Sequence, residues 1–412
     1  MPDATWNTRA TRIQMRIDEL ASITDEPGVI TRTFLSPGML QVNKMVAEWM
    51  QDAGLTVSED SVGNVLGEPP GNTDLPIFLL GSHLDTVRNA GRFDGILGVV
   101  LGIEVVDYLR TCGVSLPFSL GVAGFSDEEG VRFQNAYIGS KAFCGLITPR
   151  DLTMRDRKGV TLRQVLERWK EGRFVIPKAR YTRERVAGFL EVHMEQGPVL
   201  EHEGLALGVV TAIAGQSRMR LTWMGKASHA GTTPAALRQD ALVGAAAFVL
   251  GVQEAMVRFP GLVATVGQIF VEPNVSNVVP SRSIHSLDVR HQDDSARNQA
   301  CTWLEARARE IARERQLQFE WETLQVTNAK KCDATLSRRL TDAMESVTGS
   351  TWQLPSGAGH DAVILSRLFP VAMLLVRCRH GLSHHPDEFV ALADIAAALE
   401  VTVEFLSSWE PA

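Results

Sequence analysis

The sequence predicts an α/β fold in which a mostly parallel sheet, flanked by helices, is interrupted by an inserted α+β domain. The chain has 412 residues, which is more than one ordinary hydrophobic core accommodates. Residues 76–126 contain a strand, a helix and a strand that are each apolar throughout, as is typical of a parallel sheet covered on both faces. Residues 211–326 instead alternate strands and helices in hairpin-like order.

The first domain is expected to comprise residues 1–210 and 327–412. An N-terminal helical stretch precedes a helix over 40–55, whose apolar residues recur at helical spacing until Gly54. The elements predicted after it are a short hairpin over 57–69, a strand over 76–82, a buried helix over 95–110, a strand over 117–126, and a C-terminal helix after the segment 354–369.

The inserted domain is expected to comprise residues 211–326, with four strands and two helices. Its predicted elements are a strand over 216–227, a helix over 238–256, strands over 264–273 and 283–291, a long helix over 296–316, and a closing strand over 318–326. This order predicts one α+β layer set into the first domain.

The composition argues against two classes of partner. With 41 basic and 48 acidic residues the formal charge is −7, whereas binding to nucleic acid or to an anionic membrane grows from clustered Lys and Arg. The first residues lack the apolar core of a signal peptide, and no apolar run approaches the ~20 residues of a membrane span. The five cysteines show no CxxC spacing, which favours reduced thiols and a cytoplasmic location.

Polar side chains follow two strands of the predicted sheet at the point where each strand ends. His83 and Asp85 come directly after the first strand, and the acidic residues 127–129 come after the second. In such sheets ligands bind beyond the carboxyl ends of the strands. His83 and Asp85 stand one position apart on an extended chain, so both side chains point to the same side, and Asp85 can accept the second imidazole N–H.

Four segments together offer the donors of a metal site. Besides the two strand ends, Asp94 lies in GRFDG and His193 in EVHMEQGP. Burying such polar groups costs on the order of 2–7 kcal/mol each unless a partner compensates them. Each motif alone is more often incidental, but His and carboxylate donors without thiolate are typical of catalytic zinc, manganese or cobalt. The four segments therefore predict a metal site.

Seven ordered motifs across roughly residues 30–405 resemble the dinuclear metal-dependent amidohydrolases. This family includes allantoate amidohydrolases, N-carbamoyl-L-amino-acid hydrolases and β-ureidopropionases, and it is related to aminoacylases and dinuclear carboxypeptidases. The motifs are GSHLDTV with GRFDG (81–95), DEEGVRFQNAYIGS (127–140), EVHMEQGPVLE (191–201), GKASHAGTTPAALRQDA (225–241), PNVSNVVP (273–280), SGAGHDA (356–362) and VRCRHGLSHHPDEF (376–389).

The resemblance implies two divalent metal ions, with manganese favoured and zinc or cobalt as alternatives. One ion would be held by His83, Asp94 and His193, and the other by Asp94, Glu129 and His384, so that Asp94 bridges them. Asp85 would orient His83, and Glu128 would be the general base. His385 stands where the family usually has a small residue, and it is a rival of His384 as ligand.

The resemblance also assigns substrate-binding residues. Gln196 would lie near the ureido group, and His229 would stabilise the oxyanion of the tetrahedral intermediate. The substrate carboxylate would be bound by Asn277, by the planar fork of Arg290 and by backbone N–H groups of Gly357 or Ala358, with His360 behind them. Without the resemblance, His229 would be interpreted as a helix-entry residue and Arg290 as a surface residue.

The function implied is hydrolysis of a ureido (N-carbamoyl) C–N bond in a small carboxylate, closest to the plant-type allantoate amidohydrolases of purine catabolism. Ammonia and carbon dioxide would leave from the carbamate. An N-carbamoyl-L-amino-acid hydrolase or β-ureidopropionase is the nearest alternative. A dinuclear aminoacylase or peptidase is disfavoured by His193, and a non-catalytic binding protein by Glu128. The resemblance further implies a homodimer formed through the inserted domain, which would close over the site.

Overall fold

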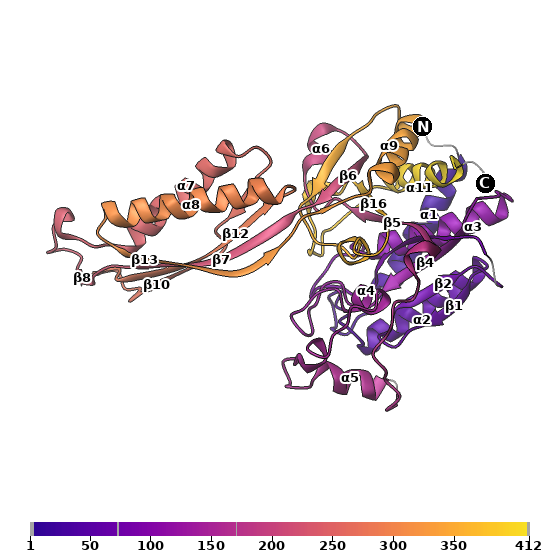
Figure 1. Ribbon diagram of the computed structural model, residues 1–412, viewed down its shortest axis with the longest axis horizontal. Coiled ribbons are helices and arrows are strands. Elements are labelled where there is room, and N and C mark those ends of the chain that lie inside the picture. Colours follow the sequence, from indigo (N-terminus) through magenta and orange to yellow (C-terminus); the bar gives the residue numbers. More distant parts are fainter. Residues whose placement is uncertain (1–3, 72–73, 170, 410–412) are drawn as a thin grey trace. The chain divides into compact units, whose positions relative to one another are not determined.

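The computed structural model describes residues 4–71, 74–169 and 171–409, and the chain divides into two compact units. One unit contains the chain up to Thr211 and from Cys332 onward, and the other is Ala212–Lys331 (Figure 1).

The first unit is built on a sheet that has nine strands among the described residues, in the order β1-β2-β4-β3-β5-β16-β6-β14, with β15 beside β6. Strand β14 belongs to the end of the second unit and pairs there with the last two residues of β6. The central strands β4, β3, β5 and β16 pair in parallel, and β1, β2, β6 and β14 pair antiparallel with their neighbours. The mostly parallel sheet predicted from the sequence is therefore confirmed. The strands are β1 (Thr56–Glu59), β2 (Val65–Glu68), β3 (Ile77–His83), β4 (Ser119–Phe125), β5 (Val186–Met194), β6 (Leu207–Ile213), β14 (Lys330–Lys331), β15 (Gln353–Ser356) and β16 (Val371–Val376).

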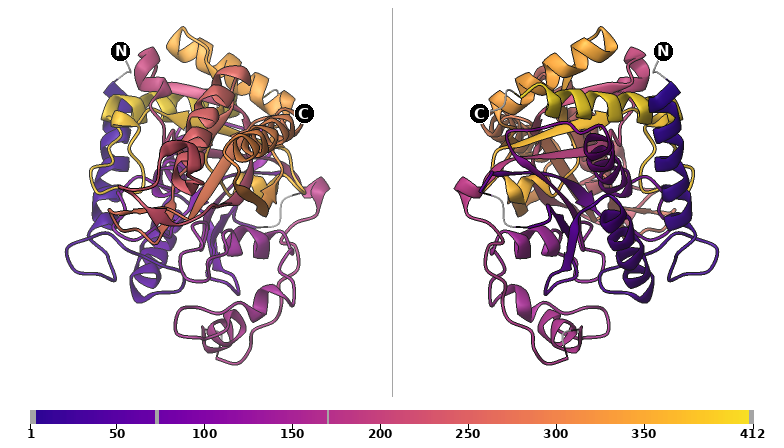
Figure 2. Two further views of the ribbon diagram at one scale, coloured as in Figure 1. Left: turned by 90° about the vertical axis from the view of Figure 1, so that its left-hand side faces the viewer. Right: turned by 90° about the vertical axis from the view of Figure 1, so that its right-hand side faces the viewer.

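Helices cover both faces of this sheet, which explains why β3 is buried along its whole length. On one face, α1, α2, α3, α9 and α11 share one hydrophobic core with Phe78 and Leu80 of β3 (Figure 2). On the other face, Phe125 of β4 packs on Phe143 of α4. The helices are α1 (Ala4–Ala21), α2 (Pro37–Asp52), α3 (Ile96–Thr111), α4 (Ile138–Phe143), α5 (Leu162–Trp169), α6 (Val199–Glu203), α9 (Ala334–Thr348), α10 (Ala362–Leu365) and α11 (Leu392–Ser407).

The second unit places α7 and α8 side by side on one face of an antiparallel sheet ordered β10-β12-β7-β13, with β9 also beside β12 (Figure 1). Trp223 of β7 and Phe248 of α7 lie in its core. The elements are β7 (Gly215–Met224), β8 (Ser228–His229), α7 (Ala241–Arg258), β9 (Val263–Thr265), β10 (Ile269–Glu272), β11 (Val278–Val279), β12 (Arg282–His291), α8 (Asp294–Glu314) and β13 (Gln318–Thr327).

The strand predicted over 264–273 is interrupted in the structure. Thr265 pairs with Asp288 and Ile269 pairs with His285. The chain advances four residues between these two pairs on this strand but only three on β12, so this strand has one extra residue. The extra residue breaks the ladder near Gly267 and produces β9 and β10 as two pieces. A single inserted residue leaves the apolar pattern intact, and the pattern therefore predicted one strand.

Among the described helices, α7 alone is long and apolar enough to cross a membrane by length and composition. Its buried side, which includes Ala245, Phe248 and Val252, packs into the core of the second unit. Val243, Leu250 and Val257 lie on the other side and are exposed by 43%, 62% and 86%. These three residues, seven positions apart, form one stripe of the helix surface, called here the α7 stripe.

A buried carboxylate fastens α1 to α3. Glu104 of α3 is fully buried and forms ion pairs with two arginines of α1. Arg9 lies 2.6 Å from the carboxylate, and Arg12 donates to both of its oxygens. Arg16 lies 3.7 Å from the same carboxylate.

Replacing Glu104 by Ala should lower the free energy of unfolding by about 2–3 kcal/mol, because Arg9 and Arg12 lose their buried partner and keep only the more exposed Asp107. Urea denaturation followed by circular dichroism measures this loss. Glu48→Ala, which removes an exposed 4.0 Å pair with Lys44, is the matched control and should cost less than about 0.5 kcal/mol. Equal midpoints for the two variants would contradict the structural role of Glu104.

Candidate metal centre

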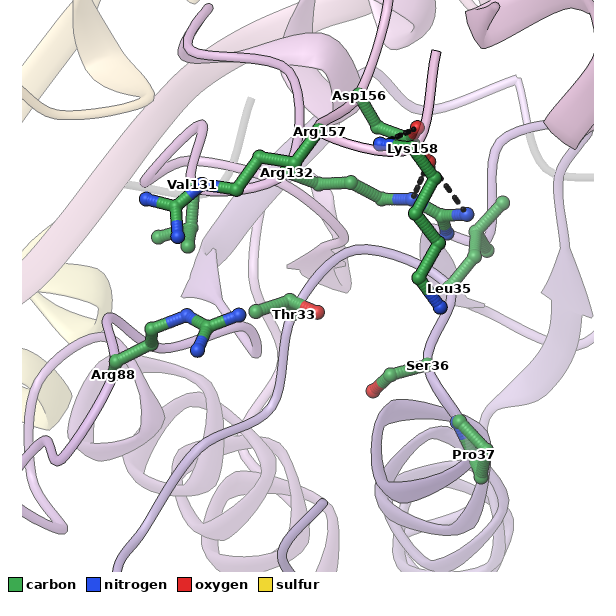
Figure 3. Close-up of a pocket in the computed structure, with 10 residues that line it drawn as sticks. All are labelled: Thr33, Leu35, Ser36, Pro37, Arg88, Val131, Arg132, Asp156, Arg157 and Lys158. Atoms are coloured by element: carbon green, nitrogen blue, oxygen red, sulfur yellow. Dashed lines mark hydrogen bonds and ion pairs between the residues drawn. The ribbon is translucent and has the colours of Figure 1, made fainter. Parts of the chain in front are cut away.

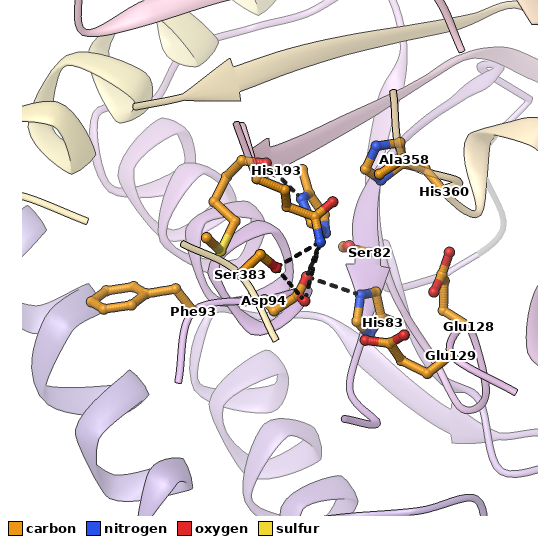
Figure 4. A network of polar contacts seen from close by, with 12 residues as sticks. Ser82, His83, Phe93, Asp94, Glu128, Glu129, His193, Ala358, His360 and Ser383 are labelled. Atoms are coloured by element: carbon orange, nitrogen blue, oxygen red, sulfur yellow. Dashed lines mark hydrogen bonds and ion pairs between the residues drawn. The ribbon is translucent and has the colours of Figure 1, made fainter. Parts of the chain in front are cut away.

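The carboxyl ends of two adjacent parallel strands bring two imidazoles together. His83 is the last residue of β3 and His193 the penultimate residue of β5, and both side chains are buried. Asp94 approaches them from the loop that leads into α3, so that the three residues offer one donor atom each within 4.8 Å of one another (Figure 4).

Asp94 uses its two carboxylate oxygens for different partners. Oδ1 lies 3.1 Å from Nε2 of His193 and 3.7 Å from Nε2 of His83. Oδ2 lies 3.1 Å from Nε2 of His384. Glu129 completes a second group, because its Oε1 is 3.2 Å from the same nitrogen of His384. The geometry therefore presents two donor sets that share one carboxylate.

Main-chain carbonyls fix the tautomers of the two buried imidazoles. Nδ1 of His83 is 3.0 Å from the carbonyl oxygen of Asp85, and Nδ1 of His193 is 2.9 Å from that of Met194. A carbonyl only accepts, so each Nδ1 carries a hydrogen. In the neutral ring the lone pair is therefore on Nε2, the nitrogen that faces Asp94. A metal ligand requires that tautomer.

Asp85 contacts His83, as predicted, and also holds the acidic turn after β4. Its main-chain carbonyl is closer to His83 than its carboxylate, which is 3.5 Å away. The carboxylate also accepts the backbone N–H groups of Glu128 (2.9 Å) and Glu129 (3.2 Å). Asp85 thus links the end of β3 to the acidic turn after β4.

Glu128 is buried and lies in a third group of possible metal donors, with His83 and Glu129. The geometry alone would admit it as a ligand as well as a base. Burial raises the pKa of Glu128 well above that of an ordinary glutamate, and the neighbouring Glu129 carboxylate adds to the shift. A carboxyl group with a raised pKa is suited to accepting and returning a proton near neutral pH.

His384 joins the cluster and His385 does not. His384 adopts a left-handed backbone (φ 57°) that aims its ring at Asp94, although the side chain is 48% exposed. His385 faces its own loop, where its Nδ1 accepts the backbone N–H of Asp387. The structure therefore separates the two neighbours that the sequence left as rivals.

The cluster stabilises positive charge. Hydrogen bonds that the His384 imidazole donates to the carboxylates of Asp94 and Glu129 raise the pKa of His384 to about 10. Burial opposes the charged form of His83, but hydrogen bonds with Asp85 and Asp94 outweigh it and raise the pKa well above the usual value. Divalent cations would satisfy the same carboxylates in place of these protons. The donor set, with imidazole and carboxylate and no thiolate, fits divalent metal ions.

Gln196 lies against the cluster rather than facing an open space. Its Nε2 donates to Ser383 Oγ (2.8 Å) and to Asp94 Oδ2 (3.2 Å), and its buried Oε1 has no partner in the described chain. Ser383, which the sequence analysis missed, also donates to Asp94 Oδ2 at 3.1 Å. The sequence signal that could have identified Ser383 is its position directly before His384 in SHHPDE.

Gly95 allows the Asp94 loop to pass close to His83. Its φ is 70°, and a Cβ at this position would lie 2.5 Å from the imidazole ring. Only glycine meets both requirements.

The glycine-rich SGAGHDA segment also approaches the cluster. The ring of His360 packs edge-on against His193 at 4.6 Å between centroids, and its Nε2 is 2.7 Å from Ser356 Oγ. The N–H of Ala358 makes a 3.3 Å contact with the same hydroxyl. A Cβ at Gly357 would meet no atom within 4 Å, so this backbone borders open space.

Three predicted substrate residues belong to the second unit. His229 and Asn277 lie together, because β8 pairs with β11 and the N–H of Ala230 donates to the Asn277 carbonyl. Nδ1 of His229 accepts the N–H groups of Gly231 and Thr232, which leaves the hydrogen on Nε2. Arg290 lies near the other end of β12 and forks onto the Asp288 carboxylate at 3.0 and 3.2 Å.

Glu388 positions Asp94 and was not predicted. One oxygen of this buried carboxylate accepts the backbone N–H groups of Phe93 (2.7 Å) and Asp94 (3.0 Å), and its other oxygen has no partner in the described chain. Burial raises the pKa of Glu388 to about 7, and the Asp94 carboxylate adds to this shift. Glu388 is four residues beyond His384. It therefore connects the loop that carries His384 to the backbone of Asp94.

Comparisons with known proteins agree with this geometry. Residues 79–408 match peptidase family M20/M25/M40. Allantoate deiminase 2 of Glycine max is 37% identical, over 95% of this chain and 88% of that protein. The N-carbamoyl-L-amino acid amidohydrolase of Geobacillus stearothermophilus is also 37% identical, over 95% of this chain and 96% of the other. A hydantoinase/carbamoylase family amidase from Burkholderia multivorans superimposes with a TM-score of 0.91 at 32% identity, covering 98% of each chain.

Replacing Glu388 by Ala should weaken manganese binding by roughly 10–100-fold, because the Asp94 backbone loses its acceptor. Isothermal titration calorimetry of the metal-free protein with Mn²⁺ measures this effect. Glu388→Gln keeps an acceptor oxygen and should retain most of the affinity, and Asp387→Ala, at an exposed neighbouring position, should leave it unchanged. Wild-type affinity in Glu388→Ala would rule out the positioning role.

Proposed function

The chain belongs to peptidase family M20/M25/M40, and we propose that it is a metal-dependent amidohydrolase that cleaves the ureido C–N bond of allantoate. The membership confirms the resemblance carried by the seven sequence motifs. The observation that carries the proposal is the carboxylate of Asp94, whose two oxygens face His193 and His384 separately. The soybean relative is named for allantoate, and it matches along nearly the whole chain.

The proposed ligands are His83, Asp94 and His193 for one ion, and Asp94, Glu129 and His384 for the other. Manganese is the ion we favour, with zinc and cobalt as alternatives. Two divalent ions bound there would supply Lewis acidity toward water and the ureido carbonyl.

Glu128 would manage the proton. As the buried carboxyl beside the cluster, it would accept a proton from the attacking water and return it to the leaving nitrogen. The C–N bond of the carbamoyl group would break, and the released carbamate would decompose to ammonia and carbon dioxide, leaving ureidoglycine.

Residues of both units would bind the substrate. His229 carries its hydrogen on Nε2, as a donor to the oxyanion requires. Arg290, with Asn277, would exchange its internal partner Asp288 for the substrate carboxylate. Gln196 would turn from Asp94 to the ureido group, and Gly357 with Ala358 would offer backbone N–H groups to the carboxylate.

The test is a substrate panel on the manganese-loaded protein. Ammonia release is assayed with allantoate, an N-carbamoyl-L-amino acid, β-ureidopropionate and an N-acetyl amino acid. We expect turnover of allantoate. Glu128→Gln should reduce kcat by about 10²–10⁴-fold, because the positioned base is lost, while Mn²⁺ binding is retained. Turnover of only a carbamoyl amino acid would transfer the assignment to the activity named for the Geobacillus relative, and full activity of Glu128→Gln would refute the mechanism.

We also place the enzyme in the cytoplasm as a homodimer. All five cysteines are free thiols, which suits a reducing compartment. Within the second unit, His229 and Asn277 lie beyond one end of β12 and Arg290 lies near the other (Figure 1). Arg290 lies eight steps along the extended strand from Arg282, a span of about 27 Å. One copy of this unit therefore presents either His229 with Asn277 or Arg290 to a given small substrate, but not both.

A second copy would supply the missing end, and it would also cover the α7 stripe. Val243, Leu250 and Val257 expose apolar surface at heptad spacing, the pattern by which a helix packs against a partner helix.

Replacing both Leu250 and Val257 by Glu should convert the dimer to a monomer, because two charges would be buried in an apolar contact. Light scattering coupled to gel filtration gives the mass. Val175→Glu, at a residue of the first unit that is 75% exposed, is the control and should remain dimeric. A monomeric wild type, or an unchanged mass for the double variant, would contradict this interface.

A further inference from the structure

A cavity of about 330 Å³ lies in the first unit and shares no residue with the metal cluster. Three segments contribute its charged lining: Arg88 beyond β3, Arg132 beyond β4, and the turn that holds Asp156, Arg157 and Lys158. Figure 3 shows the Lys158 side chain extending toward the Leu35–Ser36 segment.

The cavity is cationic in a protein whose formal charge is −7. Its lining includes four basic side chains and one acidic side chain, Asp156. That carboxylate is already engaged, because it accepts the backbone N–H groups of Lys158 (2.9 Å) and Val160 (3.0 Å) and pairs with Arg132 at 3.5 Å. A positive cavity of this kind concentrates anions.

The turn that carries Arg157 and Lys158 has a defined conformation. Arg155 and Thr161 form a β-bridge across it, and within it the N–H of Asp156 donates to the carbonyl of Val160. The side chains of Arg157 and Lys158 are exposed, so their charges lower the free energy of unfolding little. The backbone that carries these two side chains to the cavity is ordered by the bridge and the hydrogen bond. Arg88 lies in an exposed 3.0 Å pair with Glu26, which a stronger anion can replace.

The remaining lining is partly apolar. Leu35, Pro37 and Val131 contribute to it, and Arg132 holds the wall together by donating to the carbonyl of Phe34 at 2.9 Å. The start of α2 adds no free donor of its own at Gly38 or Met39, because Asp25 and Ser36 accept these N–H groups. Selectivity therefore rests on the side chains.

We propose that this cavity binds a small organic dianion, either a phosphate monoester or a dicarboxylate. The negative groups would be bound by Arg88, Arg157 and Lys158, since guanidinium forks match phosphate and carboxylate oxygens. The carbon skeleton would lie against Leu35 and Val131. The site is independent of the proposed hydrolysis, because none of its residues takes part in that reaction.

Isothermal titration calorimetry of the manganese-loaded protein at low salt tests the proposal with two probes that share an aromatic skeleton, phenyl phosphate and phthalate. At least one should bind once per chain, and the tighter one identifies the anion class. The double variant Arg157→Ala/Lys158→Ala should weaken binding about tenfold or more, because two charged contacts are lost. Phenol, which lacks the charges, should not bind.

The matched control is Arg150→Ala/Lys178→Ala, which removes the same charge from exposed positions of the first unit that do not line the cavity. It should bind like the wild type. Three results would overturn the proposal. These are no binding of either probe, wild-type affinity in Arg157→Ala/Lys158→Ala, which would place the anion elsewhere, such as on the metals, and equal weakening in both double variants, which would reflect net charge alone.

Discussion

The carboxylate of Asp94 sets the geometry of the first unit's polar centre. It is buried, and three imidazoles approach its two oxygens from three different segments. A lone carboxylate at that depth would be strongly disfavoured, so its surroundings supply either protons or cations. Burial opposes ionisation of Asp94, but the hydrogen bonds with His193, His384 and His83 outweigh it and hold its pKa well below the usual range. The parallel strands, the Asp94 loop and Glu388 all serve to hold this one group in place.

Two residues at the same centre have a strained backbone. Gln196 and His384 both adopt left-handed conformations that side chains other than glycine rarely occupy, at φ 58° and 57°. Such conformations persist only where the surrounding structure over-determines them. Here the Gln196 amide reaches Ser383 and Asp94, and the His384 ring reaches Asp94 and Glu129. The local cost is thus offset by contacts that orient donors.

Much of the fold could be predicted because its signals are local. Apolar strands alternating with an apolar helix predict a parallel sheet, and residues that directly follow such strands converge at one edge, as His83 and the acidic turn do. The interactions that the sequence did not reveal involve the backbone. Glu388 bonds to amides 294 and 295 positions away, and Asp85 uses its carboxylate on amides and its carbonyl on His83. A backbone N–H or carbonyl is the same in every residue except proline, so the residue types do not reveal which main-chain group a side chain contacts. The extra residue between β9 and β10 lies within one mostly apolar segment, and that segment therefore gives no sign of two strands.

The length of strand β12 sets the distance between the two ends of the second unit that would carry substrate-binding residues. Side chains on a strand alternate between two faces, so inserting one residue would turn every later side chain to the opposite face. Inserting two would keep each face and move Arg290 outward by about 7 Å. Unless a bulge absorbs the extra residue, as happens between β9 and β10, the length of β12 can therefore change during evolution only in paired steps. Relatives that act on longer or shorter molecules are expected to differ in β12 by even numbers of residues.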